Sequence, residues 1–252
     1  MPGLYDNKFA GVRGFLAYML AHPGKKLMFM GSELGQFDEW NSTEQLQWNL
    51  LGYEKHRQLN HFFATANKFY CDTPAMHEND YDWNGFQWIA LDDYKHSIIS
   101  FRRIAYDGSE VIVVCNFQPM LRENYKIGVP KFGIYKEVLN SEAEEFGGCG
   151  IVNEGELKAQ DAADHDLPYS INITLAPLSV IYIELDKELP APEPKKKKTT
   201  NRKAAALKKA KAEKAAKAES KADEKVDEKP VVEEKEETKE TKAEEKVETV
   251  EE

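Results

Sequence analysis

The amino-acid sequence predicts an α+β protein built from three unlike parts. Two stretches near the N-terminus space their apolar residues as amphipathic helices do, with one short apolar run between them. The middle of the chain is a series of short β-rich runs, and no Trp, Tyr or Phe occurs from Pro190 onward. We therefore expect a helical segment over residues 1–80, an antiparallel β-sandwich over 81–187 and a disordered tail over 188–252.

The helical segment is expected to hold two helices and one strand. Residues 6–22 and 53–71 carry apolar side chains at helical spacing, and Asp6 or Asn7 can cap the first helix. Residues 27–30, LMFM, form a short apolar run that is typical of a fully buried strand. The order helix, short strand, polar loop, helix is typical of an α/β unit with a parallel sheet, as in (β/α)8 barrels.

The β-sandwich is expected from seven short runs separated by turn signals such as Asp107-Gly108. Regular short strands without intervening helices are typical of antiparallel sandwiches. We assign Trp83 and Trp88 to the sandwich core or to its boundary with the helical segment. The sandwich should be closed on itself, whereas residues 1–80 alone should expose the apolar faces of both helices. The expected strands lie within residues 85–93, 97–106, 110–119, 123–129, 133–140, 169–176 and 178–185.

Charge is distributed unevenly along the chain. Residues 195–252 hold 18 Lys and Arg and 16 Asp and Glu, so the rest of the chain holds 16 basic and 28 acidic residues. An acidic body argues against the clustered basic face of a nucleic-acid-binding protein, and a neutral polyol ligand suits it better. The tail is low in complexity, basic and then acidic. A solvated spacer is its simplest interpretation, and a docking role for the basic half is the alternative.

No metal or other cofactor is expected. The six histidines show no ligand spacing, and the three cysteines contain no CxxC pair. An odd number of well-separated cysteines suits a reducing cytoplasm. The N-terminus lacks the pattern of a signal peptide, and no apolar stretch is long enough to cross a membrane. We therefore expect a cytoplasmic protein without membrane contact.

An unusually polar loop follows the apolar run at residues 27–30. The stretch GSELGQFDEWN places three carboxylates, two amides and a tryptophan directly after it. In (β/α)8 barrels, functional side chains lie at the carboxyl ends of the strands and in the loops that follow them. The loop is therefore the candidate rim of a binding or catalytic site.

Longer motifs carry a resemblance to a known family. MPG…KFAGVRGFLAYMLAHPGKKLMFMGSELGQFDEWN is followed by LQWNLL, PAMHENDYD, GFQWI, SIISFRR, VIVVCNF, EVLNSEAEEFGGCGI and LPYSINITLAPLSVIYIEL. Together these motifs resemble the bacterial 1,4-α-glucan (glycogen) branching enzymes of the α-amylase superfamily, glycoside hydrolase family 13, over nearly all of residues 1–186. The resemblance implies that residues 1–80 are the last segment of the catalytic barrel, with its eighth strand at 27–30. It also implies that the sandwich is of the α-amylase C-terminal type.

The resemblance implies a chemistry whose catalytic residues are expected outside this sequence. Enzymes of the family cleave an α-1,4 bond with an Asp nucleophile and a Glu acid, then transfer the glucan chain to a 6-hydroxyl. Such retaining chemistry needs two carboxyl groups about 5 Å apart. In the family, these groups and a third Asp precede the segment that matches Met1. Glu33, Asp38 and Glu39 are not expected to replace them, so no catalytic residue is expected in this chain.

The resemblance also implies a glucan-binding role for the polar loop. Trp40 and Trp48 can stack on the apolar faces of glucose rings, and Glu33, Gln36 and Asn41 can hydrogen-bond the hydroxyl groups. The alternative for both tryptophans is structural, with the indole rings closing the base of the loop against the sandwich. For Trp48, which has apolar neighbours in LQWNLL, that alternative weighs at least as much.

Three functions remain open from the sequence. The first is the C-terminal part of a branching enzyme, with an α-glucan and the missing N-terminal part of the enzyme as partners. The second is a stand-alone module that binds α-glucan without catalysis. The third is hydrolysis of the amylase or debranching type, against which EVLNSEAEEFGG argues, because that segment resembles branching enzymes specifically.

Overall fold

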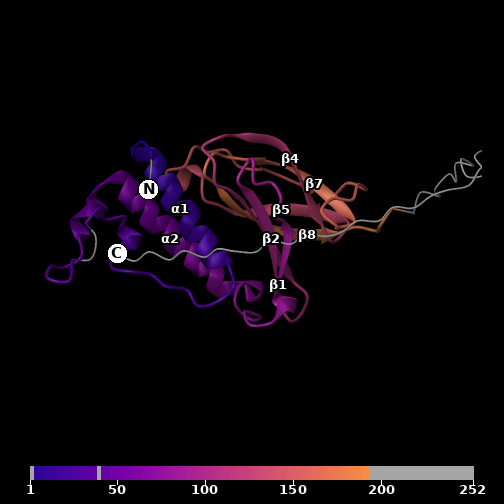
Figure 1. The fold of residues 1–252 in the computed structure, drawn as a ribbon, viewed down its shortest axis with the longest axis horizontal. Helices are drawn as coiled ribbons and strands as arrows, with labels where there is room; N and C mark the ends of the chain where they lie inside the picture. Colours follow the sequence, from indigo (N-terminus) through magenta and orange to yellow (C-terminus); the bar gives the residue numbers. More distant parts are fainter. Residues whose placement is uncertain (1–2, 39–40, 193–252) are drawn as a thin grey trace, which may run out of the picture. The chain divides into compact units, whose positions relative to one another are not determined.

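A computed structural model describes residues 3–38 and 41–192 of the chain (Figure 1). Two long helices, α1 (Tyr5–Ala21) and α2 (Glu54–Asp72), precede a region of strands. The strands are β1 (Phe86–Ala90), β2 (Ile98–Ile104), β3 (Glu110–Asn116), β4 (Arg122–Val129), β5 (Gly133–Asn140), β6 (Leu157–Lys158), β7 (Tyr169–Leu175) and β8 (Val180–Glu188). Short 3-10 helices are η1 (Ser32–Leu34), η2 (Trp48–Gly52), η3 (Pro74–Met76), η4 (Trp83–Gly85) and η5 (Glu144–Phe146).

The strands form two antiparallel sheets. Six of them make one sheet in the order β1-β2-β3-β8-β5-β6, and β4 pairs with β7 in the other. Each of the seven expected β runs overlaps a strand of the structure. The strand that was not expected, β6, has two residues, which is too short for an alternating pattern to be seen in the sequence.

The first hydrophobic core lies between the two sheets. Along β3, Ile112 and Val114 face the two-stranded sheet, whereas Val111, Val113 and Cys115 face the other way, as the two-residue period of a strand requires. The inward side chains of the two-stranded sheet that meet this core are Ile127, Val129, Ile171, Ile173 and Leu175. This is the β-sandwich that the sequence predicts.

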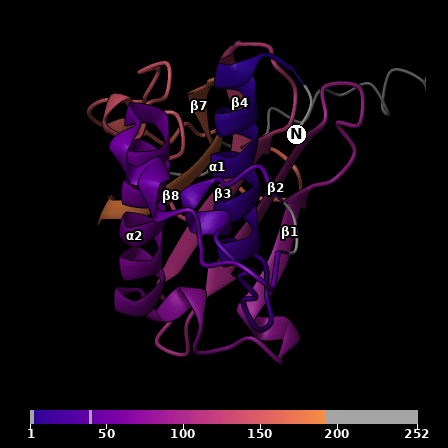
Figure 2. The ribbon, with the colours of Figure 1, turned by 90° about the vertical axis from the view of Figure 1, so that its left-hand side faces the viewer.

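The second hydrophobic core lies between the six-stranded sheet and the helices. Figure 2 shows α1 and α2 side by side in front of β3 and β8. From the helices, the fully buried Leu20, Leu59 and Phe62 meet Val113 and Tyr182 of the sheet. The apolar helix faces, which residues 1–80 alone would expose, are therefore buried against the sheet in this chain. The described part of the chain has three layers: helices, a six-stranded sheet and a two-stranded sheet.

Polar contacts fix the helices to the sheet. Arg13 of α1, which is buried, forms an ion pair with Glu142, and its Nε donates to the carbonyl oxygen of Ser141 at 2.6 Å. Tyr182 Oη donates to the carbonyl oxygen of Ala17 at 2.6 Å. The boundary expected near residue 80 stays a prediction, although the residues on its two sides share a core.

The strand expected at residues 27–30 is not formed. The backbone there is irregular, and Leu27 is 79% exposed and Phe29 43% exposed. A barrel strand needs a hydrogen-bonded neighbour, and no strand within residues 3–38 or 41–192 pairs with this run. The expected fully buried strand is therefore wrong for this structure.

The start of α1 also differs from expectation. Leu4 is the N-cap residue and makes no side-chain capping bond, so Asp6 and Asn7 are not caps. Asp6 lies in the first turn instead, where a negative charge interacts favourably with the helix dipole, and it pairs with Lys55 of α2 at 3.0 Å.

The expected disordered tail lies outside the described residues, except for its first few positions. Within the part of the chain that the structure describes, no helix is both long and apolar enough to span a membrane.

Candidate functional site

The polar loop begins with a tight turn set by two glycines. Gly31 (φ +79°) and Gly35 (φ +63°) flank η1, and both occupy the left-handed region that favours glycine. Between them, Leu34 is fully buried. The turn thus buries the side chain of Leu34 and leaves the neighbouring polar residues near the surface.

Helix α2 holds this turn in place. Nδ1 of His56 lies 2.7 Å from the carbonyl oxygen of Leu34, so this nitrogen is the donor. Asn60 Nδ2 donates to the backbone carbonyl of Glu33 at 3.4 Å. Glu33 is therefore positioned through its backbone, with its half-buried carboxylate still able to accept hydrogen bonds from a ligand.

The side chain of Gln36 makes its contacts within the loop. Its Nε2 donates to the carbonyl oxygen of Asp38 at 3.2 Å. Its Oε1 is buried, and a Cβ added to Gly31 would lie 2.4 Å from that oxygen. The amide is thus packed against the turn, which leaves it less free for a ligand than the sequence suggests.

Asn41 also makes local contacts. Its Oδ1 accepts from the backbone N of Thr43 at 3.2 Å and from the Thr43 hydroxyl at 2.8 Å. This is a turn in which an Asn side chain caps the backbone two residues on. Trp40, the other candidate in this stretch, lies outside the described residues.

Trp48 is the most accessible of the described candidates. It begins η2 and is 55% exposed. The adjacent Gln47 donates from its amide to the carboxylate of Asp38, which ties the two ends of the loop together. The structural alternative expected the indole ring to close the base of the loop against the sandwich. At this exposure the ring instead can offer a face to a ligand.

An apolar groove of about 470 Å³ lies beside the loop. Val12, Phe15 and Met19 of α1 line it on one side, and Leu27 and Phe37 of the loop line it on the other. Phe15 is 55% exposed and Phe37 58% exposed. Exposed apolar side chains gathered in one groove are typical of a surface that packs against another protein segment.

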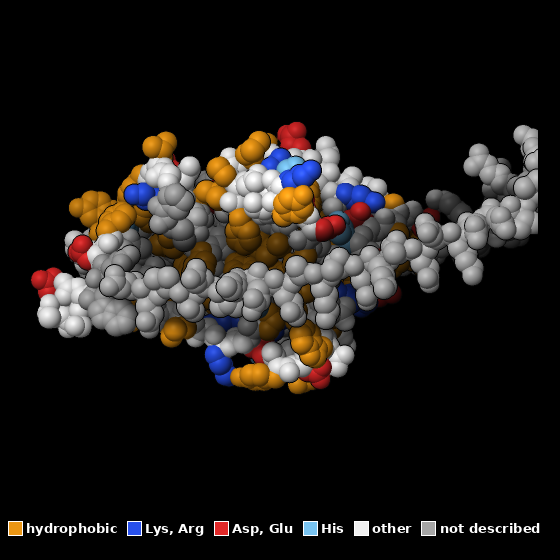
Figure 3. All heavy atoms as spheres, in the orientation of Figure 1, with side chains coloured by type: hydrophobic (Ala, Val, Ile, Leu, Met, Phe, Trp, Pro, Cys, Tyr) orange, Lys and Arg blue, Asp and Glu red, His pale blue; other side chains and the backbone are white. Residues whose placement is uncertain are grey.

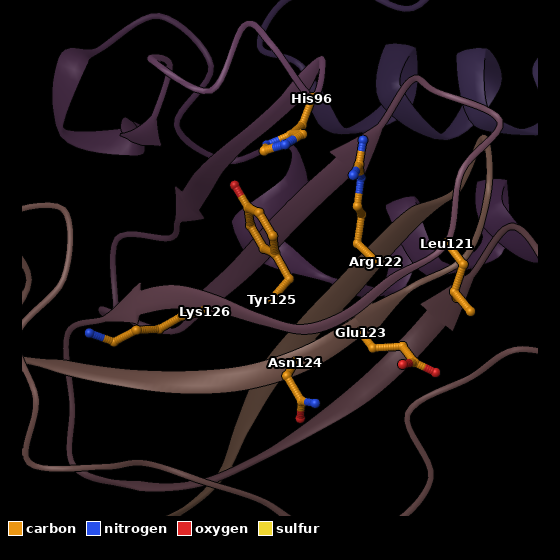
Figure 4. Close-up of a pocket in the computed structure, with 7 residues that line it drawn as sticks. All are labelled: His96, Leu121, Arg122, Glu123, Asn124, Tyr125 and Lys126. Carbon is orange, nitrogen blue, oxygen red and sulfur yellow. The ribbon is translucent and has the colours of Figure 1, made fainter.

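A second cavity, of about 590 Å³, lies on the outer surface of β4 (Figure 4). Several of its polar groups are paired with residues outside the cavity. Tyr125 Oη donates to Asp93 at 2.9 Å, and His96 Nδ1 lies 2.7 Å from the same carboxylate. Burial, together with this hydrogen bond, raises the pKa of Tyr125 above its ordinary value. Arg122 donates to Gln118 at 2.8 Å. These contacts form a local polar network, in which Arg122 Nε is buried without a hydrogen-bond partner among the described residues.

Among the described residues, no group of three or more His, Cys, Asp or Glu side chains is placed to hold a metal ion. The loop, with its exposed tryptophan and its half-buried carboxylate, is suited to binding. Its side chains can stack on a ring and accept hydrogen bonds from hydroxyl groups.

The comparisons with known proteins agree with this architecture. The family model described as "Alpha amylase, C-terminal all-beta domain" matches residues 88–186. That range contains almost all of the described strands. The chain therefore carries the C-terminal β-domain of an α-amylase-type protein, preceded by a helical segment.

Sequence relatives define the family more closely. The chain is 47% identical over 185 residues to the 1,4-alpha-glucan branching enzyme GlgB of Halothermothrix orenii, covering 73% of this chain and 29% of the relative. It is 45% identical to the GlgB of Aquifex aeolicus, covering 73% and 29%, and 44% identical to that of Thermosynechococcus vestitus, covering 75% and 25%. The chain belongs with the C-terminal portion of the bacterial 1,4-α-glucan branching enzymes. It spans less than a third of the length of these relatives.

Proposed function

We propose that this chain is the C-terminal part of a 1,4-α-glucan branching enzyme and does not catalyse branching by itself. The observation that carries the proposal is the solvent-exposed apolar run at residues 27–30 beside an open apolar groove. In the family, the matching run is a strand of the catalytic barrel. The exposed run and groove form the face on which the rest of the barrel would dock.

The docking face has the chemistry that such an assembly needs. Phe15, Leu27 and Phe37 are each more than half exposed, and each would lose water contact when a neighbouring strand pairs with the run. Burial of each such side chain is worth roughly 1.5–3 kcal/mol. Several burials together can offset the loss of translational and rotational freedom on association.

We propose that the polar loop contributes to the glucan-binding rim of the assembled enzyme. Trp48 would stack on a glucose ring, and Glu33 would accept hydrogen bonds from its hydroxyl groups. Their exposure and half-burial support these roles. Gln36 and Asn41 would act mainly by holding the loop, because the amide nitrogen of Gln36 and the amide oxygen of Asn41 already make hydrogen bonds within it. Trp40 keeps its proposed stacking role.

A complementation assay tests the proposal. The purified chain would be mixed with the N-terminal portion of the Halothermothrix orenii relative, ending where its match to this chain begins. New α-1,6 linkages in amylose would be followed by NMR. The chain alone should form none, and the mixture should form them. Linkages formed by the chain alone, or none formed by the mixture, would contradict the proposal.

Two matched variants sharpen the assay. Leu27→Asp puts a charge on the docking face and should abolish complementation. Leu91→Asp changes a comparably exposed leucine (54%) in the loop after β1, and it should leave complementation unchanged. Equal activity of the two variants would place the docking face elsewhere.

The second candidate is a stand-alone α-glucan-binding module, which the exposed Trp48 would also serve. This module would bind amylose and would fail to complement. We also propose a cytoplasmic location, which the three free cysteines of the described structure support. Recovery of the chain from an extracytoplasmic fraction of its source cells would contradict that location.

A further inference from the structure

Exposed aromatic side chains gather at a second place, below β1. Trp83 is 86% exposed and Tyr81 81% exposed, and Trp88 next to them is 40% exposed. Figure 3 shows hydrophobic side chains mixed with acidic and basic ones along the lower edge of the molecule, where Figure 1 places this segment. The assignment of Trp83 to the core or a boundary is wrong, because the indole ring lies in solvent.

These rings surround a cavity of about 430 Å³. Tyr81, Trp83 and Trp88 line it, together with the carboxylates of Asp80 and Asp82. Cavities of a few hundred Å³, with aromatic walls and a small number of polar groups, are the usual form of small-ligand sites. We refer to these five residues as the aromatic platform.

The floor of the platform is rigid. The ring of Trp88 packs edge-on against Phe86, with centroids 4.8 Å apart, and against Phe101 at 5.6 Å. Phe101 is fully buried. Trp88 therefore keeps one side on the hydrophobic core while part of its surface remains open, so a ligand that stacks on it need not first order the ring.

The carboxylates are also oriented in advance. Asp82 caps η4, and its Oδ1 accepts from the backbone N and the Nδ2 of Asn84, both at 2.9 Å. Asp80 forms an ion pair with the buried Arg103, whose Nη1 donates to the carbonyl oxygen of Ala21 at 2.7 Å. A carboxylate offers about four acceptor sites, so the exposed Asp82 retains capacity for hydroxyl donors. The side chain of Asp80 is only 6% exposed, and its ion pair with Arg103 holds the wall of the cavity in place.

Stacking surfaces next to acceptor groups fit a sugar ring. A glucosyl unit has one face of C–H groups, which packs on an aromatic ring, and a rim of hydroxyl groups, which donate to carboxylates. A polyanionic ligand would be repelled by two carboxylates and by the acidic body. A neutral, hydroxyl-rich chain meets no such penalty.

The platform and the polar loop lie at opposite ends of α1. The loop turn at Gly35 lies beside Phe9, since a Cβ on Gly35 would be 3.4 Å from that ring. The platform cavity instead includes His22, which follows the last residue of the helix. Thirteen residues of helix separate the two, which corresponds to about 20 Å.

We propose that the aromatic platform is a second α-glucan-binding site, which holds a 1,4-linked glucosyl chain independently of the polar loop. Trp83 and Tyr81 provide the stacking surface, Trp88 the floor and Asp82 the hydroxyl acceptor, while Asp80 holds the cavity wall through its ion pair with Arg103. The inference goes beyond the proposed function, because it needs no other part of an enzyme. A site at this distance from the loop would keep a glucan polymer tethered to the protein.

Maltoheptaose binding to the full chain tests the proposal. Binding would be measured by calorimetry and by tryptophan fluorescence, with retardation by amylose in native gels as a second readout. Trp83→Ala and Tyr81→Ala should each raise the Kd about tenfold, the equivalent of 1.4 kcal/mol. Trp83→Phe keeps an aromatic face and should recover most of the affinity. Because both side chains are more than 80% exposed, the variants should unfold like the parent chain.

Matched controls separate this site from the loop and from general surface effects. Tyr106→Ala removes a similarly exposed ring (75%) from the turn between β2 and β3 and should leave the Kd within about twofold. Trp48→Ala reports on the polar loop alone. An unchanged Kd in Trp83→Ala overturns the proposal, whatever complementation shows. Protection of Trp83 by the N-terminal portion of a relative, without maltoheptaose binding, would also overturn it and identify a protein contact.

Discussion

The β region and the helical segment use apolar residues in opposite ways. In the β region, every described strand has a hydrogen-bonded neighbour, and alternate residues fill the core on each side of the large sheet. In the helical segment, the run LMFM at residues 27–30 is at least as apolar, yet it is irregular and half open to solvent. A strand sequence becomes a strand only when another strand is present to pair with it.

The two regions also differ in how much apolar surface each exposes to solvent. The helices bury one apolar face on the six-stranded sheet, and the sheet buries the facing apolar residues beneath the helices. The opposite face of α1, with Phe15 and the groove beside it, is only partly covered by residues 27–37. The helical segment is thus complete toward the β region and incomplete on its other side.

The strongest test of this comparison removes the helices. A chain of residues 81–192 should lose cooperative unfolding, because the sheet face that holds Val113, Cys115 and Tyr182 would be exposed to water. Near-UV circular dichroism and dye binding would report the loss of fixed packing. A chain of residues 1–192 is the matched control and keeps every described contact. Cooperative unfolding of residues 81–192 would show that the β region is self-sufficient, as the sequence alone suggested.

A smaller change targets the buried ion pair between the two regions. Glu142→Gln leaves the guanidinium of Arg13 buried without a charged partner, and both residues are less than 5% exposed. Breaking a buried pair in this way typically destabilises a protein by about 3–5 kcal/mol. Urea unfolding followed by circular dichroism measures the change.

The exposed pair of Lys68 and Asp72 on α2 supplies the control for that change. Asp72→Asn breaks an ion pair in full contact with water and should not shift the urea midpoint detectably. If Glu142→Gln were equally silent, the ion pair would play no part in holding the helices to the sheet.

A single methyl group tests the closeness of α1 to the β region. A Cβ on Gly14 would lie 2.8 Å from the backbone carbonyl oxygen of Leu178. Although alanine favours a helix more than glycine, Gly14→Ala should destabilise the protein by about 1–3 kcal/mol, because backbone must move. Gly52→Ala meets nothing within 4 Å and should be nearly neutral in the same urea titration. Stabilisation by Gly14→Ala would mean that the layers are less tightly packed than described.

The sequence predicts the β region well because its signals are local. Alternation in runs such as EVIVVCNF and turns such as Asp107-Gly108 do not depend on distant residues. The run at residues 27–30 carries an equally clear signal, but its outcome depends on pairing partners that a local pattern cannot report. Strand β6 was missed for a different reason, because two residues are too few to show an alternating pattern.

The candidate site stays a prediction, although the structure shows which of its residues are free to meet a ligand. The resemblance and the residue types proposed Glu33 and Trp48 as sugar contacts. They could not show that Gln36 packs against Gly31 or that Asn41 completes a turn, because both contacts depend on the path of the backbone. The exposure of Trp83 was not predicted, because large aromatic side chains are more often buried than exposed.

The gentlest test leaves the protein intact and follows its thiols. Cys115 lies on the face of β3 beneath the helices, and burial raises the pKa of its thiol well above the ordinary value. Cys71 and Cys149 are exposed. At pH 8, a thiol reagent should modify two cysteines quickly and the third only as the protein unfolds, because the thiolate is the reactive form.

The course of that third reaction decides how firmly the two regions are joined. If the helices and the sheet open together, Cys115 should react at the urea concentration at which circular dichroism reports global unfolding. If the helices detach first, it would react at lower urea, and the two regions would be separate cooperative units. Raising the pH above about 9 should lower stability, because the unfolded state then releases this proton while the folded state keeps it. Reaction of three thiols in the native protein at pH 8 would contradict the packing of α1 and α2 on β3.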